Sequence, residues 1–174
     1  MLKEKLNIAI RVDASKNIGG GHFRRCLTLA KEAKKKGHSV IFISAQLPER
    51  DRHLLIKNKI LFENIFFEKD EHIISDSKKV YNDNCYQKWL KLPVLEDAKR
   101  TSKALEKFQP NWIIFDHYGL DIKWVNKIKK NHHTPFYLAI DDLDNRNLGS
   151  DFLLDQTSII EKKRKYKTPG ILVV

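Results

Sequence analysis

The sequence has 174 residues, of which 41% are hydrophobic and 10% aromatic, so it can bury the core of one folded domain and is not of the disordered class. Its formal net charge of +11 favours an anionic partner, either a nucleic acid or a small anionic substrate. No apolar run approaches the length of a membrane span and the first residues lack the pattern of a signal peptide, so we expect a cytoplasmic protein with no membrane partner.

The basic residues are spread along the chain rather than gathered in one stripe. Two runs stand out, residues 34–36 at an expected helix end and residues 162–165 in the C-terminal tail. Cations are favoured at a helix C-terminus, so the first run is interpreted as a solvated helix end. This distribution favours a small anionic substrate and makes nucleic-acid binding the weaker alternative. The two cysteines, Cys26 and Cys85, lie too far apart to suggest a disulfide framework or a metal knuckle.

The chain starts with an expected strand, a glycine-rich turn and a helix. Residues 6–12 form a short β-branched run, which is typical of a buried strand. Residues 13–22, called the glycine loop below, contain three successive glycines. A helix pattern follows, with apolar residues at three- and four-residue steps, and Gly37 is expected just after its end.

The glycine loop favours a ligand site. Glycines let a ligand approach the main chain, and the first N–H groups of the following helix favour a phosphate or another anion. His22 stands in the first turn of that helix, where the dipole disfavours imidazolium, so it is a candidate general base. The alternative is a plain turn whose histidine caps the helix. The loop is not a dinucleotide fingerprint, because Arg24 stands where the third glycine belongs, and it does not contain the P-loop sequence.

Strand and helix patterns alternate along the rest of the chain. We expect strands at 38–44, 61–67, 112–115, 136–140 and 151–154, and helices at 49–57, between Pro93 and Pro110, and after the capping residue Asp121. A loop with one short helical turn is expected at 68–79. The alternation predicts an α/β fold: a Rossmann-like, mostly parallel sheet of six or seven strands with helices on both faces.

Three polar segments each follow a strand: the glycine loop, residues 116–121 and residues 141–146. Ligands of parallel α/β sheets bind outside the carboxyl ends of the strands. We therefore expect the three segments to converge on one binding site, with His22 near Tyr118.

The residues of these segments resemble one enzyme family. The quoted pattern is Arg11-x-Asp13, Ile18-Gly-x-Gly-His22-x-x-Arg25-Cys26, then Asp-His-Tyr-Gly-Leu-Asp at 116–121 and Asp-Asp-Leu-x-Asn-Arg at 141–146. From the first strand to about Gln156 it resembles the UDP-2,4-diacetamido-2,4,6-trideoxy-beta-L-altropyranose hydrolases of pseudaminic acid biosynthesis. The Asp-His-Tyr-Gly block is the most family-specific part, whereas the glycine loop is shared with related transferases.

The resemblance implies the N-terminal half of a glycosyltransferase B fold and a UDP-sugar substrate. It implies that His22 acts on the attacking water, that Tyr118 is the active-site tyrosine, and that UDP leaves without the help of a metal or a cofactor. The residues implied to shape the loops or contact the substrate are Arg11, Asp13, Gly19, Gly20, Gly21, Arg25, Asp116, His117, Asp141 and Asp142.

The resemblance also implies a division of the chain into domains. Residues 1–157 are the expected Rossmann-like, sugar-side domain, and residues 158–174 are a basic tail or the start of a C-terminal nucleotide-binding domain. An excised domain, a truncated product and one half of a split enzyme with a separate partner domain all remain open. Two other functions remain open as well: a glycosyltransferase half related to the lipid II GlcNAc transferase, and a catalytically silent binding domain.

Overall fold

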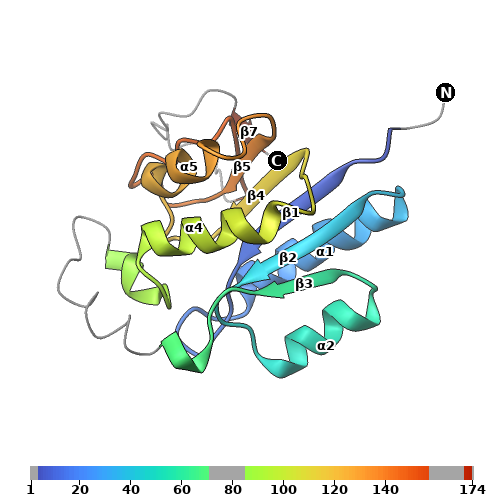
Figure 1. Cartoon of the computed structure of the whole chain (residues 1–174), viewed down its shortest axis with the longest axis horizontal. Coiled ribbons are helices and arrows are strands. Elements are labelled where there is room, and N and C mark those ends of the chain that lie inside the picture. Colours follow the sequence, from blue (N-terminus) through green and yellow to red (C-terminus); the bar gives the residue numbers. More distant parts are fainter. Residues whose placement is uncertain (1–3, 71–84, 157–170, 174) are drawn as a thin grey trace.

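The computed structural model describes residues 4–70, 85–156 and 171–173. In this described part, seven parallel strands form one sheet in the order β3-β2-β1-β4-β5-β6-β7 (Figure 1). The prediction of a parallel sheet of six or seven strands is confirmed. The strands are β1 (Asn7–Val12), β2 (Ser39–Ser44), β3 (Leu61–Asn64), β4 (Trp112–Asp116), β5 (Phe136–Ile140), β6 (Phe152–Asp155) and β7 (Ile171–Val173).

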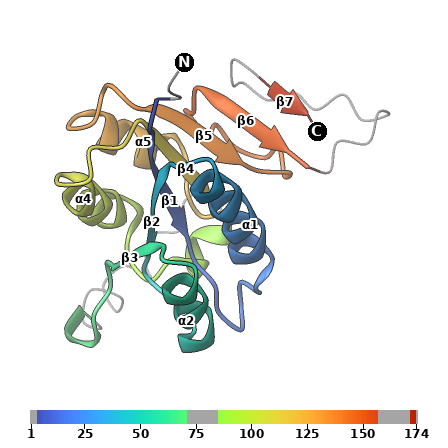
Figure 2. The same ribbon diagram turned by 90° about the vertical axis from the view of Figure 1, so that its right-hand side faces the viewer.

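Helices cover both faces of the sheet, as predicted (Figure 2). The helices α1 (Gly21–Lys35) and α2 (Glu49–Lys57) lie on one face, and α4 (Val94–Leu105) and α5 (Ile122–Lys129) lie on the other. Two short 3₁₀ helices, η1 (Glu68–Asp70) and η2 (Cys85–Trp89), lie between β3 and α4 in the sequence. Within the described residues, no helix is long and apolar enough to cross a membrane.

The period of two along β1 divides the core into two clusters. Ile10 and Val12 pack with the α1 and α2 side chains, whereas Ala9 packs with the α4 and α5 side chains. Arg11 alternates with Ile10 and Val12, so its side chain is directed toward α4, where Asp97 accepts its hydrogen bonds. One strand thus places a guanidinium in the core, beside the buried carboxylate of Asp97.

Most predicted boundaries agree with the structure to within one or two residues. The third strand is shorter than the expected 61–67, because it pairs with β2 only as far as Asn64. Asp121 caps α5 by accepting a hydrogen bond from the backbone N–H of Lys123, and Gly37 follows α1 with a φ of +90°, as predicted. Of the loop expected at 68–79, only residues 68–70 lie within the described residues.

The last described strand, β7, lies beyond the domain boundary predicted at residue 157. It pairs with β6 in parallel and so extends the same sheet. The rest of the predicted tail, residues 158–170 and residue 174, lies outside the described residues. The division of the chain into two domains stays a prediction.

Candidate functional site

The candidate site lies at the point where the strand order of the sheet reverses, between β1 and β4. After β1 the chain forms β2 and β3 on one side, and it then returns to form β4 on the other side of β1. The loops that leave β1 and β4 therefore part from each other at the carboxyl edge, and ligands of open α/β sheets bind at such a switch point. His22 follows β1, whereas Asp116 and Tyr118 stand at the end of β4.

The structure brings His22, Asp116 and Arg25 together. The Nδ1 atom of His22 lies 2.6 Å from Oδ1 of Asp116. Arg25, one turn further along α1, donates to both carboxylate oxygens of Asp116 at 2.5 Å. The thiol of Cys26 lies 3.5 Å from the same carboxylate. Three side chains of one helix thus surround a single buried acid at the end of β4.

The contacts of Asp116 set the tautomer of His22. Burial opposes the ionisation of Asp116, but hydrogen bonds from Arg25 and His22 outweigh burial and lower its pKa. An ionised carboxylate only accepts hydrogen bonds, so the 2.6 Å contact requires a hydrogen on Nδ1 of His22. Arg25 Nη2 lies 3.1 Å from the same nitrogen, but its shorter contact, 2.5 Å, is to Asp116. We therefore assign the Nδ1–H tautomer, which leaves Nε2 as the proton acceptor.

Tyr118 lies beside this histidine, as predicted. The two rings meet edge to face with their centroids 4.6 Å apart. The hydroxyl of Tyr118 donates to Asp142 at 2.5 Å. Burial and this carboxylate raise the pKa of Tyr118, so it stays a protonated phenol. Its only O–H is donated to Asp142, so the hydroxyl oxygen of Tyr118 can accept a hydrogen bond from a ligand.

The third predicted segment, residues 141–146, is held against Tyr118 by Arg146. Arg146 Nη2 donates to Asp141 at 2.6 Å, and its guanidinium carbon lies 5.9 Å from the centre of the Tyr118 ring. The other carboxylate oxygen of Asp141 accepts from the backbone N–H of Leu143. Asp141 is buried, whereas Asp142 is half-buried at the tyrosine hydroxyl. The three polar segments therefore converge, with Asp141 positioning the loop and Asp142 orienting Tyr118.

The glycine loop leaves its backbone open. A Cβ built on Gly19, Gly20 or Gly21 would meet no described atom within 4 Å, so packing does not demand these glycines. Only Gly19 needs its residue type for conformation, because its φ is +80°. The first turn of α1 contains no acid, and no side chain of the described residues caps its N-terminus. Its first amides are therefore oriented toward the open space over the loop, as an anion site requires.

Arg11, at the end of β1, and Asp13, at the start of the glycine loop, both have buried side chains. Their side chains are 1% and 0% exposed, and Arg11 donates to both oxygens of Asp13 at 2.6 and 3.0 Å. Asp13 also accepts from the Ser44 hydroxyl and the Ala45 amide, both at 2.8 Å. Burial raises the pKa of Asp13, but Arg11 and its other partners outweigh burial and lower it to about 2. We assign both residues a positioning role at the start of the glycine loop.

His117 completes this buried layer. Its Nδ1 accepts from the Gly119 amide at 2.9 Å, so its Nε2 carries the hydrogen and faces Asp13 at 3.5 Å, beyond hydrogen-bond distance. Burial lowers the pKa of His117 to about 4, despite the opposing effect of Asp13. His117 is therefore neutral and shapes the turn between β4 and Tyr118.

The shifted pKa of His117 predicts a pH-dependent stability. Its folded-state pKa of about 4 lies below the ordinary value of 6.5, so the unfolded chain binds the proton more tightly. The contribution of a neutral, buried His117 to the free energy of unfolding is complete above pH 6.5 and is lost as the pH falls toward 4. We expect His117 to contribute a loss of about 2 kcal/mol between pH 7.5 and 5.

Urea unfolding at these two pH values measures this loss. In His117→Asn, whose amide oxygen can still accept from Gly119, the loss should be smaller by that amount. An equal loss in the wild type and the variant would assign the pH dependence to other groups.

Two groups of site residues were missed by sequence reasoning. Asp97 of α4 accepts from Arg11 and from the indole N–H of Trp124, and its side chain is 0% exposed. An acid in the first turn of a helix is usually solvated, so only the buried Arg11 could have indicated that it needs a partner. Tyr86 and Trp89 of η2 lie 5.3 and 6.0 Å from the Tyr118 ring, and no local pattern joined them to that loop.

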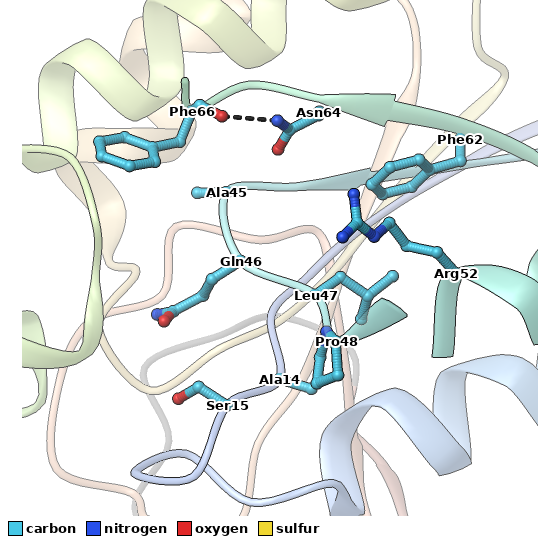
Figure 3. Close-up of a pocket in the computed structure, with 10 residues that line it drawn as sticks. All are labelled: Ala14, Ser15, Ala45, Gln46, Leu47, Pro48, Arg52, Phe62, Asn64 and Phe66. Carbon is cyan, nitrogen blue, oxygen red and sulfur yellow. Dashed lines mark hydrogen bonds between the residues drawn. The ribbon is translucent and has the colours of Figure 1, made fainter. Parts of the chain in front are cut away.

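A pocket of about 350 Å³ lies on the same sheet edge but is distinct from the His22–Asp116 pair (Figure 3). It is at the ends of β1, β2 and β3, on the other side of the start of the glycine loop. Its lining residues are Ala14, Ser15, Ala45, Gln46, Leu47, Pro48, Arg52, Phe62, Asn64 and Phe66. In the described parts of the chain, no group of three or more histidine, cysteine, aspartate or glutamate side chains is placed to hold a metal ion.

Comparisons with known proteins identify the fold. No family model matches the sequence, and no curated protein matches it. A glycosyltransferase from Rickettsia africae ESF-5 is similar in structure, with 21% identity and a TM-score of 0.52, over 79% of this chain and 30% of that one. The glycotransferase of kitacinnamycin is similar over the same shares, with 14% identity and a TM-score of 0.51. The chain thus spans about 30% of the length of these structures, and it has the α/β Rossmann-like fold found in glycosyltransferases.

Proposed function

We propose that this chain carries the catalytic base of an enzyme that cleaves a nucleotide-activated sugar at its anomeric carbon. The observation behind the proposal is the hydrogen bond from His22 Nδ1–H to Asp116, which makes Nε2 of His22 a proton acceptor beside the glycine loop. Among the described residues, no group hydrogen-bonds to Nε2. An imidazole oriented by a buried carboxylate is a common way to activate a hydroxyl group.

The proposed step is the removal of a proton from the attacking hydroxyl. As its oxygen bonds to the anomeric carbon, the bond to the nucleotide diphosphate breaks and the diphosphate leaves with the electron pair. Asp116 stabilises the imidazolium that forms, and Arg25 keeps Asp116 ionised. Tyr118 lies against the His22 ring, and its hydroxyl oxygen, whose hydrogen is donated to Asp142, accepts a hydrogen bond from a sugar hydroxyl. The open amides at the start of α1 suit an anionic part of the substrate.

Two acceptors fit this chemistry, and different observations favour them. Water makes the enzyme a hydrolase of UDP-2,4-diacetamido-2,4,6-trideoxy-beta-L-altropyranose, which the Asp-His-Tyr-Gly block at 116–119 and its contact with His22 support. A sugar hydroxyl makes it a glycosyltransferase, which the structural similarity to glycosyltransferases supports. We place the hydrolase first because Tyr118, which belongs to the Asp-His-Tyr-Gly block, contacts the proposed base His22.

The identity of the acceptor can be tested with isotopic water. The natural protein, with any sequence that accompanies residues 1–174, is incubated with the UDP-sugar in H₂¹⁸O, with and without a chelator. We expect UDP release in both cases and one ¹⁸O atom on the anomeric carbon of the free sugar. UDP release only after a sugar acceptor is added, with no ¹⁸O-labelled free sugar, would establish the transferase instead. No UDP release under either condition would contradict both functions.

A further inference from the structure

The pocket at the ends of β1, β2 and β3 is formed by both apolar and polar side chains. At about 350 Å³ its volume is within the range of small-molecule sites, roughly 300–1,000 Å³. Phe62, Phe66 and Leu47 supply apolar surface, and all three are only partly buried. Ser15, Gln46 and Asn64 supply hydrogen-bonding groups to the same space (Figure 3). Aromatic faces next to amides are the surfaces that carbohydrates need, because a sugar ring has an apolar face and a rim of hydroxyls.

The side-chain amides of Gln46 and Asn64 are held in place by hydrogen bonds that use their N–H groups and not their oxygens. Asn64 donates its side-chain N–H to the Phe66 carbonyl, and Gln46 donates to the Trp89 carbonyl, both at 2.5 Å. Within the described chain, the amide oxygens of Asn64 and Gln46 accept no hydrogen bond. Both can therefore accept from ligand hydroxyls without rearrangement.

Arg52 adds a positive charge at the rim. Its side chain is exposed and reaches from α2 toward the pocket, with its guanidinium drawn between the Phe62 ring and Leu47 (Figure 3). It forms no ion pair with a described residue, whereas Arg24 of α1 and Arg50 of α2 both pair with Asp51. A guanidinium with five donors and no ion-pair partner among the described residues is suited to a carboxylate or a phosphate.

From this combination we infer that the pocket binds a monosaccharide that carries one carboxylate or phosphate group. The anion binds Arg52, the apolar face of the ring packs on Phe62, and Asn64 and Gln46 accept from its hydroxyls. The site shares a wall with the glycine loop, because Ala14 donates to the Gln46 carbonyl at 2.9 Å and Gly19 donates to the Ser15 carbonyl at 2.8 Å. It contains neither His22 nor Tyr118, so it does not depend on the function proposed for them.

Direct binding to the 174-residue chain tests this site. Calorimetry compares glucuronate, glucose 6-phosphate, uncharged glucose and inorganic phosphate. We expect at least one of the two charged sugars to bind about tenfold or more tightly than glucose and than phosphate alone. The two charged sugars distinguish a carboxylate ligand from a phosphate ligand. Equal binding of glucose and both charged sugars, or no binding of either charged sugar at millimolar concentration, would overturn the proposal.

Two arginines of the same helix give a matched comparison. Arg52→Gln should weaken binding of the charged sugar about tenfold or more and leave glucose binding unchanged. Arg50→Gln removes the same charge from an exposed position outside the pocket and should bind as the wild type does. His22→Asn should also bind as the wild type does. An equal loss in Arg50→Gln would point to general electrostatics, and a loss in His22→Asn would place the ligand at the other site; either result contradicts the proposal.

Discussion

Replacing His22 with alanine in the complete enzyme is expected to lower kcat by about 10²–10⁴-fold, the usual contribution of a positioned general base. KM should change little, because the imidazole takes the proton in the transition state and is not needed to bind the ground state. The expected loss is large because, in the described part of the chain, the other polar groups around Asp116 are poor bases. Arg25 is a cation, and burial raises the pKa of the Cys26 thiol.

His22→Asn distinguishes the loss of the base from the loss of the hydrogen bond to Asp116. The asparagine amide can donate to Asp116 but cannot take the proton, so His22→Asn should be nearly as slow as His22→Ala. Steady-state UDP release and a thermal melt are measured on both variants. If the histidine is only a part of the helix end, its removal costs about 1 kcal/mol of stability and leaves turnover intact. Near-normal kcat with a lowered melting temperature would therefore show that His22 has only a structural role.

The sequence predicts the centre of the sheet well because the central strands are short and largely buried on both faces. Trp112 to Phe115 is an uninterrupted apolar run, which is typical of a central parallel strand. The edge strand β3 was less well predicted: its side chains alternate between exposed and half-buried, and its end depends on pairing with β2. Local pattern therefore predicts the centre of the sheet better than its edge.

The convergence of the three polar loops was also predictable, because the carboxyl ends of parallel strands share one edge. The role of each side chain at this edge could not be predicted from the sequence. Arg11 and Asp13 are implied by the resemblance to shape the loops or contact the substrate, and both side chains are buried, where Arg11 pairs with Asp13 and with Asp97. Asp97 is separated from Arg11 by 86 residues, and no spacing rule joins an acid on a helix to a particular strand residue. Burial of a charge depends on tertiary contacts, and the sequence pattern does not contain them.

The buried group around Arg11 is the second place where one substitution should have a large effect. Arg11 donates its Nε–H and an Nη–H to the two oxygens of Asp97, at 3.1 and 2.5 Å, and the indole of Trp124 donates to the same acid at 2.8 Å. Burial alone would lower the pKa of Arg11, but Asp13 and Asp97 together raise it, so it stays charged. These contacts join β1, α4 and α5 directly beneath the glycine loop.

Asp97→Ala should lower the free energy of unfolding by about 3–5 kcal/mol, the usual cost of removing one partner of a buried ion pair. The loss is large because Arg11 and the Trp124 N–H would both keep buried donors with no acceptor at that position. Glu96 provides the matched control: it stands beside Asp97 in the same first turn of α4 and pairs with Arg100, but it is partly exposed. Glu96→Ala should cost about 1 kcal/mol or less, and urea unfolding of both variants measures the difference.

A triple variant tests whether the cost arises from buried polar groups left without partners rather than from lost packing. In Arg11→Met with Asp13→Asn and Asp97→Leu, all three charges are removed, and the amide oxygen at position 13 can still accept from Ser44 and Ala45. Replacing a whole buried ionic group by uncharged side chains of similar size is often neutral or stabilising, so the triple variant should be more stable than Asp97→Ala. If Asp97→Ala costs no more than Glu96→Ala, the buried network does not hold β1 to α4. If Asp97→Ala costs the expected amount and the triple variant recovers nothing, the cost does not come from buried polar groups left without partners.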